Sequence, residues 1–286
     1  MKIGCHISIA GGIEKSIHRA EKLGINTMQI FSKNSRTWQE KTYNKSEISV
    51  FREALRKTDI FPVFIHASYL INLASPVDTI YSRSIASFLE EMKRADQLLA
   101  NTGIPFLIVH PGANRGAGEE YGLKRISKAL QIILKDSFAL KLSTMILLEN
   151  TSGMGSSLGY NFSQLKYIIE DTGYSDKIGI CFDTCHAFAA GYNLVDEEGI
   201  ENTLTELDRG VSLDKLKIIH INDSKYGLNS RKDRHTHIGE GFIGLEGFRI
   251  LVNHRLLKDL PFILETPKKS DEDDRRNISV VRKLRK

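Results

Sequence analysis

The chain has 286 residues, enough for one large α/β domain or two small ones, and 41% hydrophobic and 26% charged residues are typical of a globular protein. Its net charge of +5 allows a polyanionic partner without requiring one. The sequence contains no apolar run of about 18 residues, so no membrane span is expected. Because the start, MKIGCHISIAGG, lacks signal-peptide features and the three cysteines are too few for a disulfide framework, we expect a cytoplasmic protein.

Short apolar runs recur along the whole chain and are predicted to be β-strands. Each run is continuous, without the polar alternation of a half-exposed strand, which is typical of a parallel sheet covered on both faces. The predicted strands are residues 2–7, 27–32, 61–67, 106–112, 144–151, 178–184, 216–223 and 262–267.

Amphipathic segments between these runs are predicted to be helices. They include residues 11–24, which end at Gly24, a typical residue after a helix, and residues 82–103 and 121–140. The last segment starts at Ser270, a favourable N-cap, continues with acidic residues and ends in basic ones. This order complements the helix dipole, so we expect a closing helix here and not a basic arm for nucleic acid.

Strand–helix units repeated eight times over this length predict a (β/α)₈, or TIM, barrel. We expect one domain over residues 1–286, with the active site at the C-terminal ends of the strands. An open doubly wound sheet is the alternative fold. No Gly-x-Gly-x-x-Gly or Walker loop follows a strand, so no nucleotide cofactor is expected. The long polar loop 224–244 is predicted to be functional.

Histidines and acids gather where the predicted strands end. Any one of them is readily interpreted as a helix N-cap or a hydrogen-bonded core residue. Together they would converge on one end of a barrel, where burying so many unpaired polar groups is costly. The residues at or near strand ends are His6, His66, His110, His220, Glu149, Asp183 and Glu265, with His186 just beyond one end and His235 and His237 in the long loop.

A bound cation would remove this cost, because carboxylates and neutral imidazoles are natural ligands of zinc and manganese. In CFDTCH, Asp183 and His186 are therefore predicted to be ligands, and in DRH the i, i+2 pair Asp233 and His235 follows the same logic. Cys181 is assigned to packing. Cys185, beside His186, is an alternative soft ligand.

Several long motifs resemble those of the endonuclease IV family, which are metal-dependent apurinic/apyrimidinic (AP) DNA-repair endonucleases. The motifs are ILLENTSGMGSSLG, CFDTCHAFAAGY and HINDSK…DRHTHIGEGFIG, joined in the expected order by SKNSRTW, IHASYLINLASP, IVHPG and LETPK. The resemblance runs nearly end to end. It implies a (β/α)₈ barrel with a trinuclear zinc site, in which manganese is an alternative ion.

Carried over by position, the resemblance implies three metal pockets. The first would use His66, His110 and Glu149. Glu149 would bridge to a second, with Asp183, His220 and Glu265, and the third would use His186, Asp233 and His235. Among these, Glu149 and Glu265 are expected to act in catalysis. The same resemblance assigns Arg36, Tyr69 and Leu70 to loops that enter DNA at the missing base; packing of Tyr69 and Leu70 within their loop is the ordinary alternative.

The implied reaction is hydrolysis of the phosphodiester 5′ to an abasic site, leaving a 3′-hydroxyl and a 5′-deoxyribose phosphate, with 3′-end trimming as a secondary activity. The expected partner is double-stranded DNA with abasic sites, and the protein is expected to act as a monomer.

Two positions depart from the family pattern. Asn229 stands where glycine is more usual, and asparagine tolerates a left-handed backbone. His237 adds an imidazole after His235, and we interpret it as a supporting or surface residue.

Two other functions remain open. A barrel sugar isomerase or epimerase would need only Glu149, Asp183, His220 and Glu265 around one metal, and a DNA-damage-binding protein would use the metals for structure alone.

Overall fold

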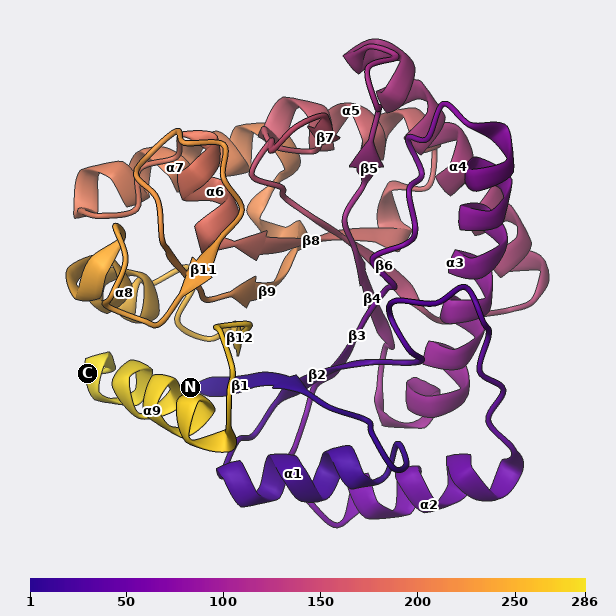
Figure 1. Cartoon of the computed structure of the whole chain (residues 1–286), viewed down its shortest axis with the longest axis horizontal. Coiled ribbons are helices and arrows are strands. Elements are labelled where there is room, and N and C mark those ends of the chain that lie inside the picture. Colours follow the sequence, from indigo (N-terminus) through magenta and orange to yellow (C-terminus); the bar gives the residue numbers. More distant parts are fainter.

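The predicted strands pair in parallel and close into a barrel in the computed structural model, which describes residues 1–286 (Figure 1). The order around the barrel is β1-β12-β9-β8-β6-β4-β3-β2. The (β/α)₈ prediction is therefore confirmed, and the open-sheet alternative is wrong. The barrel strands are β1 (Lys2–Ile7), β2 (Met28–Phe31), β3 (Val63–His66), β4 (Phe106–Val109), β6 (Met145–Glu149), β8 (Ile178–Asp183), β9 (Leu216–His220) and β12 (Pro261–Leu264).

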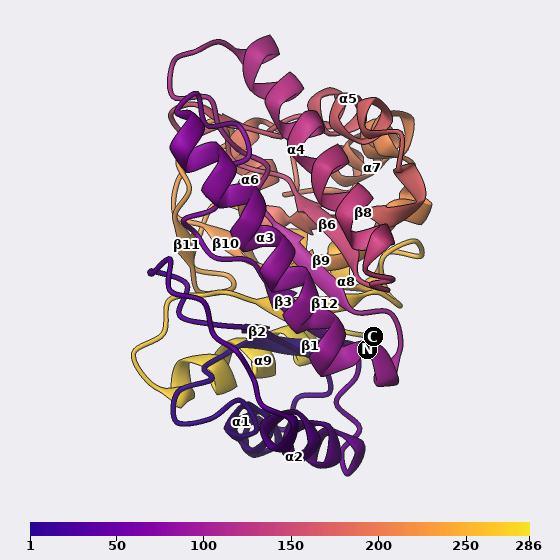
Figure 2. The same cartoon turned by 90° about the vertical axis from the view of Figure 1, so that its right-hand side faces the viewer.

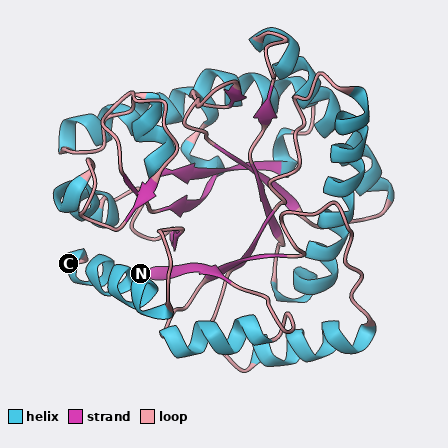
Figure 3. Ribbon diagram, viewed as in Figure 1, coloured by secondary structure: helices cyan, strands magenta, loops and turns pink.

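Helices surround the barrel on the outside, as Figure 3 shows with helices in cyan and strands in magenta. At least one helix follows each barrel strand, and the two chain ends lie close together in both Figure 1 and Figure 2. The helices are α1 (Lys15–Leu23), α2 (Lys45–Arg56), α3 (Asp78–Leu99), α4 (Glu119–Ala139), α5 (Phe162–Thr172), α6 (Thr184–Ala190), α7 (Glu197–Val211), α8 (Gly244–Asn253) and α9 (Asp271–Leu284).

The predicted helix ends agree with the local chemistry. Gly24 follows α1 in the left-handed conformation, with φ of 63°, and its N–H donates to carbonyls of the last turn. Ser270 caps α9, whose first turn is acidic and whose last turn holds Arg282 and Lys283. The C-terminal basic segment is thus a closing helix, as predicted. The predicted segment 82–103 begins late, because α3 already starts at Asp78, and it ends in a 3₁₀ turn over Ala100–Thr102.

Alternate residues of the strands form two separate apolar layers. One set packs with the helices in a core of 63 buried residues. The other forms a small cluster inside the barrel, with one residue from each of six strands. This inner cluster is Phe64, Ile108, Leu147, Cys181, Ile218 and Ile263. It fills the barrel beneath the C-terminal ends of the strands, which we call the mouth.

Short strands shape the loops at the mouth. β5 (Gly112–Ala113) pairs with β7 (Ser157–Leu158), and β10 (Asp223–Ser224) pairs with β11 (His235–Thr236), both antiparallel. The β10–β11 pair lies at the left-hand edge of the side view in Figure 2. This pairing folds the first part of the long loop predicted at 224–244 into a β-hairpin. No helix is long and apolar enough to cross a membrane.

Gly4 of β1 tests how tightly the barrel interior is packed. A Cβ atom here would collide with the carbonyl oxygen of Thr27 and lie 3.2 Å from Cδ1 of Ile263. We expect Gly4→Ala to lower the free energy of unfolding by about 1–3 kcal/mol or more, because overpacking forces the backbone to shift. Urea denaturation measures this loss.

Gly227 provides the matched control. A Cβ atom at Gly227 would meet only Cδ1 of Phe242, at 3.9 Å. Gly227→Ala should therefore change stability by no more than about 0.5 kcal/mol. Equal effects of the two substitutions would contradict the packing described for β1.

Candidate metal centre

The polar residues at the mouth are placed by the pleat of the strands. In each of six strands, the residue two positions after the inner apolar residue is a histidine or an acid. Side chains of one strand alternate between faces, so residues two apart point the same way. The six residues reached in this way are His66, His110, Glu149, Asp183, His220 and Glu265. They therefore converge inside the mouth, as the sequence predicts.

Glu149 lies at the centre of this group and is fully buried. Its Oε2 is 3.1 Å from Nε2 of both His66 and His110, and its Oε1 is 3.1 Å from Nδ1 of His220. Burial alone would raise the pKa of Glu149, but the neighbouring His110 and His220 outweigh it and hold that pKa well below its ordinary value. The two oxygens of one carboxylate thus face two different sets of histidines, which is the arrangement of a bridging ligand.

A second group forms around His220. Its Nδ1 lies 3.2 Å from Oε2 of Glu265 and 3.9 Å from Oδ2 of Asp183, in addition to the contact with Glu149. Burial would raise the pKa of Glu265, but His220 keeps it well below the ordinary value. One imidazole nitrogen therefore faces three carboxylates. The potential ligand atoms of these four residues all lie within 4.8 Å of one another.

The third group joins α6 to the β10–β11 hairpin. Oδ1 of Asp233 is 3.3 Å from Nε2 of His186 and 3.7 Å from Nε2 of His235. Asp183 also belongs here, because its Oδ2 lies 3.7 Å from Nε2 of His235. Burial would lower the pKa of His186, but Asp183 and Asp233 raise it well above the ordinary value. The three residues assigned to the third pocket are thus together, with Asp183 between this group and the second.

Four of these histidines share one hydrogen-bond pattern. One ring nitrogen lies within hydrogen-bonding distance of an oxygen that can only accept, so that nitrogen carries the hydrogen. The contacts are His66 Nδ1 to Ala67 O, His186 Nδ1 to Asn150 O, His235 Nδ1 to Glu265 O and His220 Nε2 to Gln29 Oε1, at 2.7–3.1 Å. The other nitrogen of each ring faces carboxylate oxygens.

This pattern fits a cation. A neutral imidazole whose first nitrogen donates presents a lone pair from the second, and lone pairs facing carboxylates repel unless a proton or a metal ion lies between them. The raised pKa of His186 reflects the proton, which a metal ion would replace. Nε2 of His235 is buried and has no hydrogen-bond partner, as expected of a nitrogen that is reserved for a metal. Four overlapping groups in the mouth, one of which includes Cys181, contain eight of the nine predicted ligands and can hold metal ions. Asp233 borders these groups.

Three amide side chains support the ligands and were missed in the sequence. Asn222 donates to Oδ2 of Asp183 at 2.7 Å and accepts from the N–H of Glu265, while Asn150 donates to the carbonyl and accepts from the N–H of Asp183. Gln29 contacts both His220 and Glu265. The available signal was position: Asn150 follows Glu149 directly, Asn222 lies two residues after His220, and Gln29 interrupts an apolar strand.

The remaining polar residues of these motifs have other partners. Burial raises the pKa of Cys181 and of Cys185 to about 12, which disfavours the thiolate form in the absence of a metal. Cys181 lies close to Glu149 and His220 in one candidate group, whereas Cys185 is in none. The ring of His237 lies 3.0 Å from Nδ2 of Asn277 and outside the candidate groups. Asn229 has φ of 60°, which confirms the left-handed turn expected there.

The predicted DNA-contacting residues lie in two neighbouring loops at the mouth. Tyr69 is 61% exposed and packs edge-on against Phe31, with ring centroids 5.2 Å apart, whereas Leu70 is half-buried. Arg36 is exposed in the loop after β2. Oγ of Ser68 donates to the carbonyl of Ser35 at 2.7 Å and so joins the two loops. An exposed aromatic ring supported from below is available for stacking.

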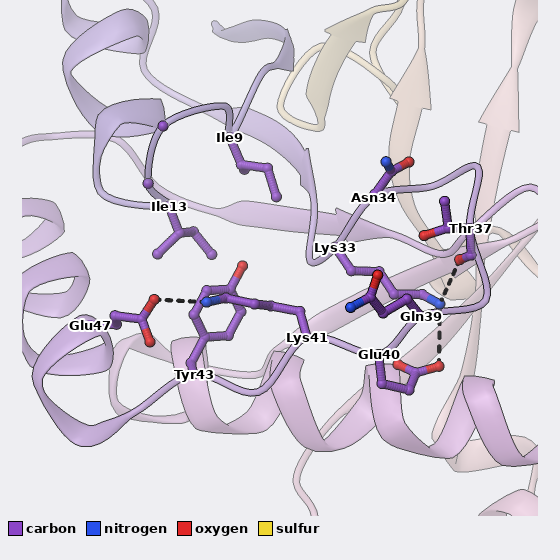
Figure 4. Close-up of a pocket in the computed structure, with 12 residues that line it drawn as sticks. Ile9, Ile13, Lys33, Asn34, Thr37, Gln39, Glu40, Lys41, Tyr43 and Glu47 are labelled. Carbon is purple, nitrogen blue, oxygen red and sulfur yellow. Dashed lines mark hydrogen bonds and ion pairs between the residues drawn. The ribbon is translucent and has the colours of Figure 1, made fainter.

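A buried lysine holds the loop that carries Arg36. Nζ of Lys33 donates to the carbonyl of Thr37, to Oε1 of Glu40 and to Oγ of Ser87 at 3.2–3.3 Å. Figure 4 shows the first two of these bonds beside a pocket of about 540 Å³. Arg94 of α3 pairs with the other oxygen of Glu40 at 2.7 Å. The loop is therefore fixed to α3 on both sides of Arg36.

Comparisons with known proteins agree with the barrel fold. A family model described as "Xylose isomerase-like TIM barrel" matches residues 17–284. The chain is 48% identical to "Probable endonuclease 4" of Chloroflexus aurantiacus, over 99% of this chain and 98% of that one. It is 46% identical to "Probable endonuclease 4" of Halothermothrix orenii, over the full length of both.

Among solved structures, the crystal structure of endonuclease IV from Thermus thermophilus has a TM-score of 0.86 and 35% identity, covering 99% of this chain and 98% of that one. D-Psicose 3-epimerase from Clostridium cellulolyticum has a TM-score of 0.70 over 99% of both chains, but at 13% identity it shows only a shared fold. With full-length relatives at 46–48% identity, the chain belongs to the endonuclease IV family, within the xylose isomerase-like TIM barrels.

Proposed function

We propose that the protein is an AP endonuclease that cleaves DNA on the 5′ side of abasic sites by means of three metal ions. The products would be a 3′-hydroxyl and a 5′-deoxyribose phosphate, and trimming of 3′ ends would be a secondary activity of the same site. The observation that carries the proposal is the shared pattern of His66, His186, His220 and His235, each with one nitrogen donating to a carbonyl oxygen and the other facing carboxylates or left unpartnered.

The residues divide into three pockets. His66, His110 and Glu149 form the first, Glu149, Asp183, His220 and Glu265 the second, and His186, Asp233 and His235 the third. The donor set of nitrogens and oxygens suits zinc, with manganese as an alternative. When bound, such ions shield the phosphate, lower the pKa of water and hold displacement in line.

The chain's own residues have defined tasks in this scheme. Glu149 would fix the spacing of the first two pockets, because its two oxygens face different histidines. Glu265 would act beside it, with Oε2 toward His220 and Oε1 held by Gln29. Asp183 is held by Asn222 between the second and third groups. These supports keep the carboxylates in place while a substrate enters and leaves.

Recognition of the damaged site would depend on the rim of the mouth, which is formed by the two loops that carry Arg36, Tyr69 and Leu70. Tyr69, with Leu70 beside it and Arg36 in the adjoining loop, would fill the space of the absent base. An abasic nucleotide has no base to unstack, so it is cheap to extrude, and this allows selection of damaged DNA without sequence reading.

A sugar epimerase is the second candidate function, because the second group alone could hold the single metal of such an enzyme and the fold is shared. The other predicted ligands argue against an epimerase, because a single-metal enzyme would have no task for them. These ligands are His66, His110, His186, Asp233 and His235. A DNA-binding protein without activity would likewise not need a complete ligand set. Elemental analysis separates one ion per chain from about three, and nicking of an abasic duplex separates enzyme from binder.

His110→Ala tests the first pocket. We expect a loss of nicking larger than the roughly 10–100-fold that removal of an outer-shell partner costs, because a direct ligand is lost. The initial rate on a duplex with one abasic site measures it. His18→Ala is the control, since His18 is an exposed residue of α1 that contacts only Glu21. Unchanged turnover at full metal occupancy in His110→Ala would rule out this assignment.

Removal of the metal should change how the stability of the protein depends on pH. In metal-free protein, the raised pKa of His186 stabilises the fold at low pH, and this contribution is lost as pH rises above the ordinary 6.5 toward the higher folded value. We expect the free energy of unfolding of the chelated protein to fall as the pH rises above about 6.5. Zinc-loaded protein should not show this fall, because metal binding requires the unprotonated ring.

Urea denaturation with and without a strong chelator gives both curves, and readdition of zinc or manganese should restore nicking. Parallel pH curves for the two forms would contradict metal binding by His186.

Tyr69→Ala tests recognition at the rim. We expect binding to an abasic duplex to weaken about tenfold or more, since stacking on an aromatic ring contributes about 1–3 kcal/mol. Binding to intact duplex should change little, because it rests on phosphate contacts. Gel-shift titrations of both duplexes at one salt concentration measure the difference. Phe138→Ala, an exposed aromatic at the far end of α4, is the control. Equal losses of affinity for both duplexes would mean that Tyr69 only packs within its loop and does not recognise the abasic site.

A further inference from the structure

Two positions in the ring of mouth residues are not accounted for by the predicted ligands. The remaining strands β1 and β2 contribute His6 and Gln29, which are paired in the sheet register. Gln29 is fully buried. Its amide lies within hydrogen-bonding distance of three polar side chains: His220, Glu265 and His6, at 2.7, 2.6 and 3.0 Å.

The hydrogens of these contacts can be assigned from chemistry alone. Nε2 of Gln29 donates to Oε1 of Glu265 at 2.6 Å, so the amide NH2 group of Gln29 faces this carboxylate oxygen. Oε1 of Gln29 then faces His220 and must receive a hydrogen from Nε2 of that ring. The second amide hydrogen points to Nδ1 of His6. Every hydrogen-bonding atom of the Gln29 amide is used.

This assignment decides which atoms of two candidate ligands remain free. His220 carries its hydrogen on Nε2, so its Nδ1 presents a lone pair toward Glu149, Glu265 and Asp183. Glu265 has Oε1 engaged, so Oε2 is the oxygen that faces the same point. Without Gln29, the opposite tautomer of His220 could donate from Nδ1 to a carboxylate, and that hydrogen would occupy the place of a cation.

We propose that Gln29 is a positioning residue for the second metal pocket: one amide fixes the tautomer of His220 and the ligating oxygen of Glu265. The inference rests on the proposed function, because it presupposes that these residues bind a metal. The side chain of Gln29 forms no hydrogen bond with the histidines of the first or the third pocket. Its effect should therefore be confined to one ion of the three.

The test is zinc affinity in Gln29→Met, which keeps the length of the side chain and removes its hydrogen bonds. Competition with a chromophoric chelator should show one ion weakened about 10–100-fold, the usual effect of losing an outer-shell partner, and two ions unchanged. Thr27→Val is the matched control: Thr27 is buried just before β2, two residues from Gln29, and its hydroxyl donates to the carbonyl of Pro62 and to no ligand. It should retain all three affinities.

The outcomes separate the role of Gln29 from the proposed function. Wild-type protein that binds one zinc ion or none overturns the proposed function. Wild-type protein with about three ions, combined with unchanged affinities in Gln29→Met, or with all three weakened in step with stability, overturns only the role of Gln29.

A second measurement does not depend on the variant. Nitrogen-15 spectra of the imidazole rings in zinc-loaded wild-type protein should show the hydrogen of His220 on Nε2. A hydrogen on Nδ1 would overturn the inference even if Gln29→Met failed to fold.

Discussion

The two-residue repeat of the β-strand is the constraint on which this site depends. Because all eight strands run in parallel, their inward positions form layers across the barrel. One layer is apolar and includes Phe64, Leu147 and Ile218; the next, two residues on, is polar throughout. A shift of one residue in any strand would turn its polar residue toward the helices and place an apolar side chain in the mouth. The register that stabilises the core is therefore the same register that assembles the centre.

A layer so rich in buried carboxylates and imidazoles is stable only if each charge lies near an opposite charge and each polar atom has a hydrogen-bond partner. Glu149 and Asp183 are completely buried, and each is surrounded by histidines or amides. The carbonyl oxygens of Ala67, Asn150 and Glu265 hold the outer nitrogens of three rings. Burying any of these acids without its partners would cost several kcal/mol, so the layer is stable only as a set. A cation would complete that set at the point where the inner nitrogens and the carboxylate oxygens converge.

Much of this arrangement was predictable from the sequence, and the reason is physical. Continuous apolar strands predict a parallel barrel, and a parallel barrel sends all strand ends to one face. The sequence could therefore predict that residues such as His66 and Glu149 lie close together, although it gives no distance between them. The supporting amides could not. Asn150, Asn222 and Gln29 have no charge to draw attention, and their roles depend on which atoms they touch across the barrel. Asp183 was likewise assigned to one pocket, whereas its oxygens also approach His235 of the third.

The hairpin and the rim loops show a different limit of sequence reasoning. The long loop was recognised as functional from its length and polarity, but its β10–β11 pairing, which carries His235 to the mouth, rests on a two-residue ladder too short to read in a pattern. The loop of Arg36 depends on Lys33 and Glu40, which lie on either side of Arg36, and on Arg94 of α3, which is 54 residues from Glu40 in the chain. The candidate ligands at the strand ends are thus positioned by local periodicity, whereas the two loops at the mouth are held by long-range polar contacts with α3. Ser87 and Arg94 of α3 hold the loop of Arg36, and Glu91 of α3 accepts from the N–H of Ser68 in the loop of Tyr69. Substitutions on this buried polar face of α3 should therefore displace the two loops, whereas substitutions on its outer face should be tolerated. The helix therefore couples the two loops that would grip DNA, although it contributes no residue to the metal centre.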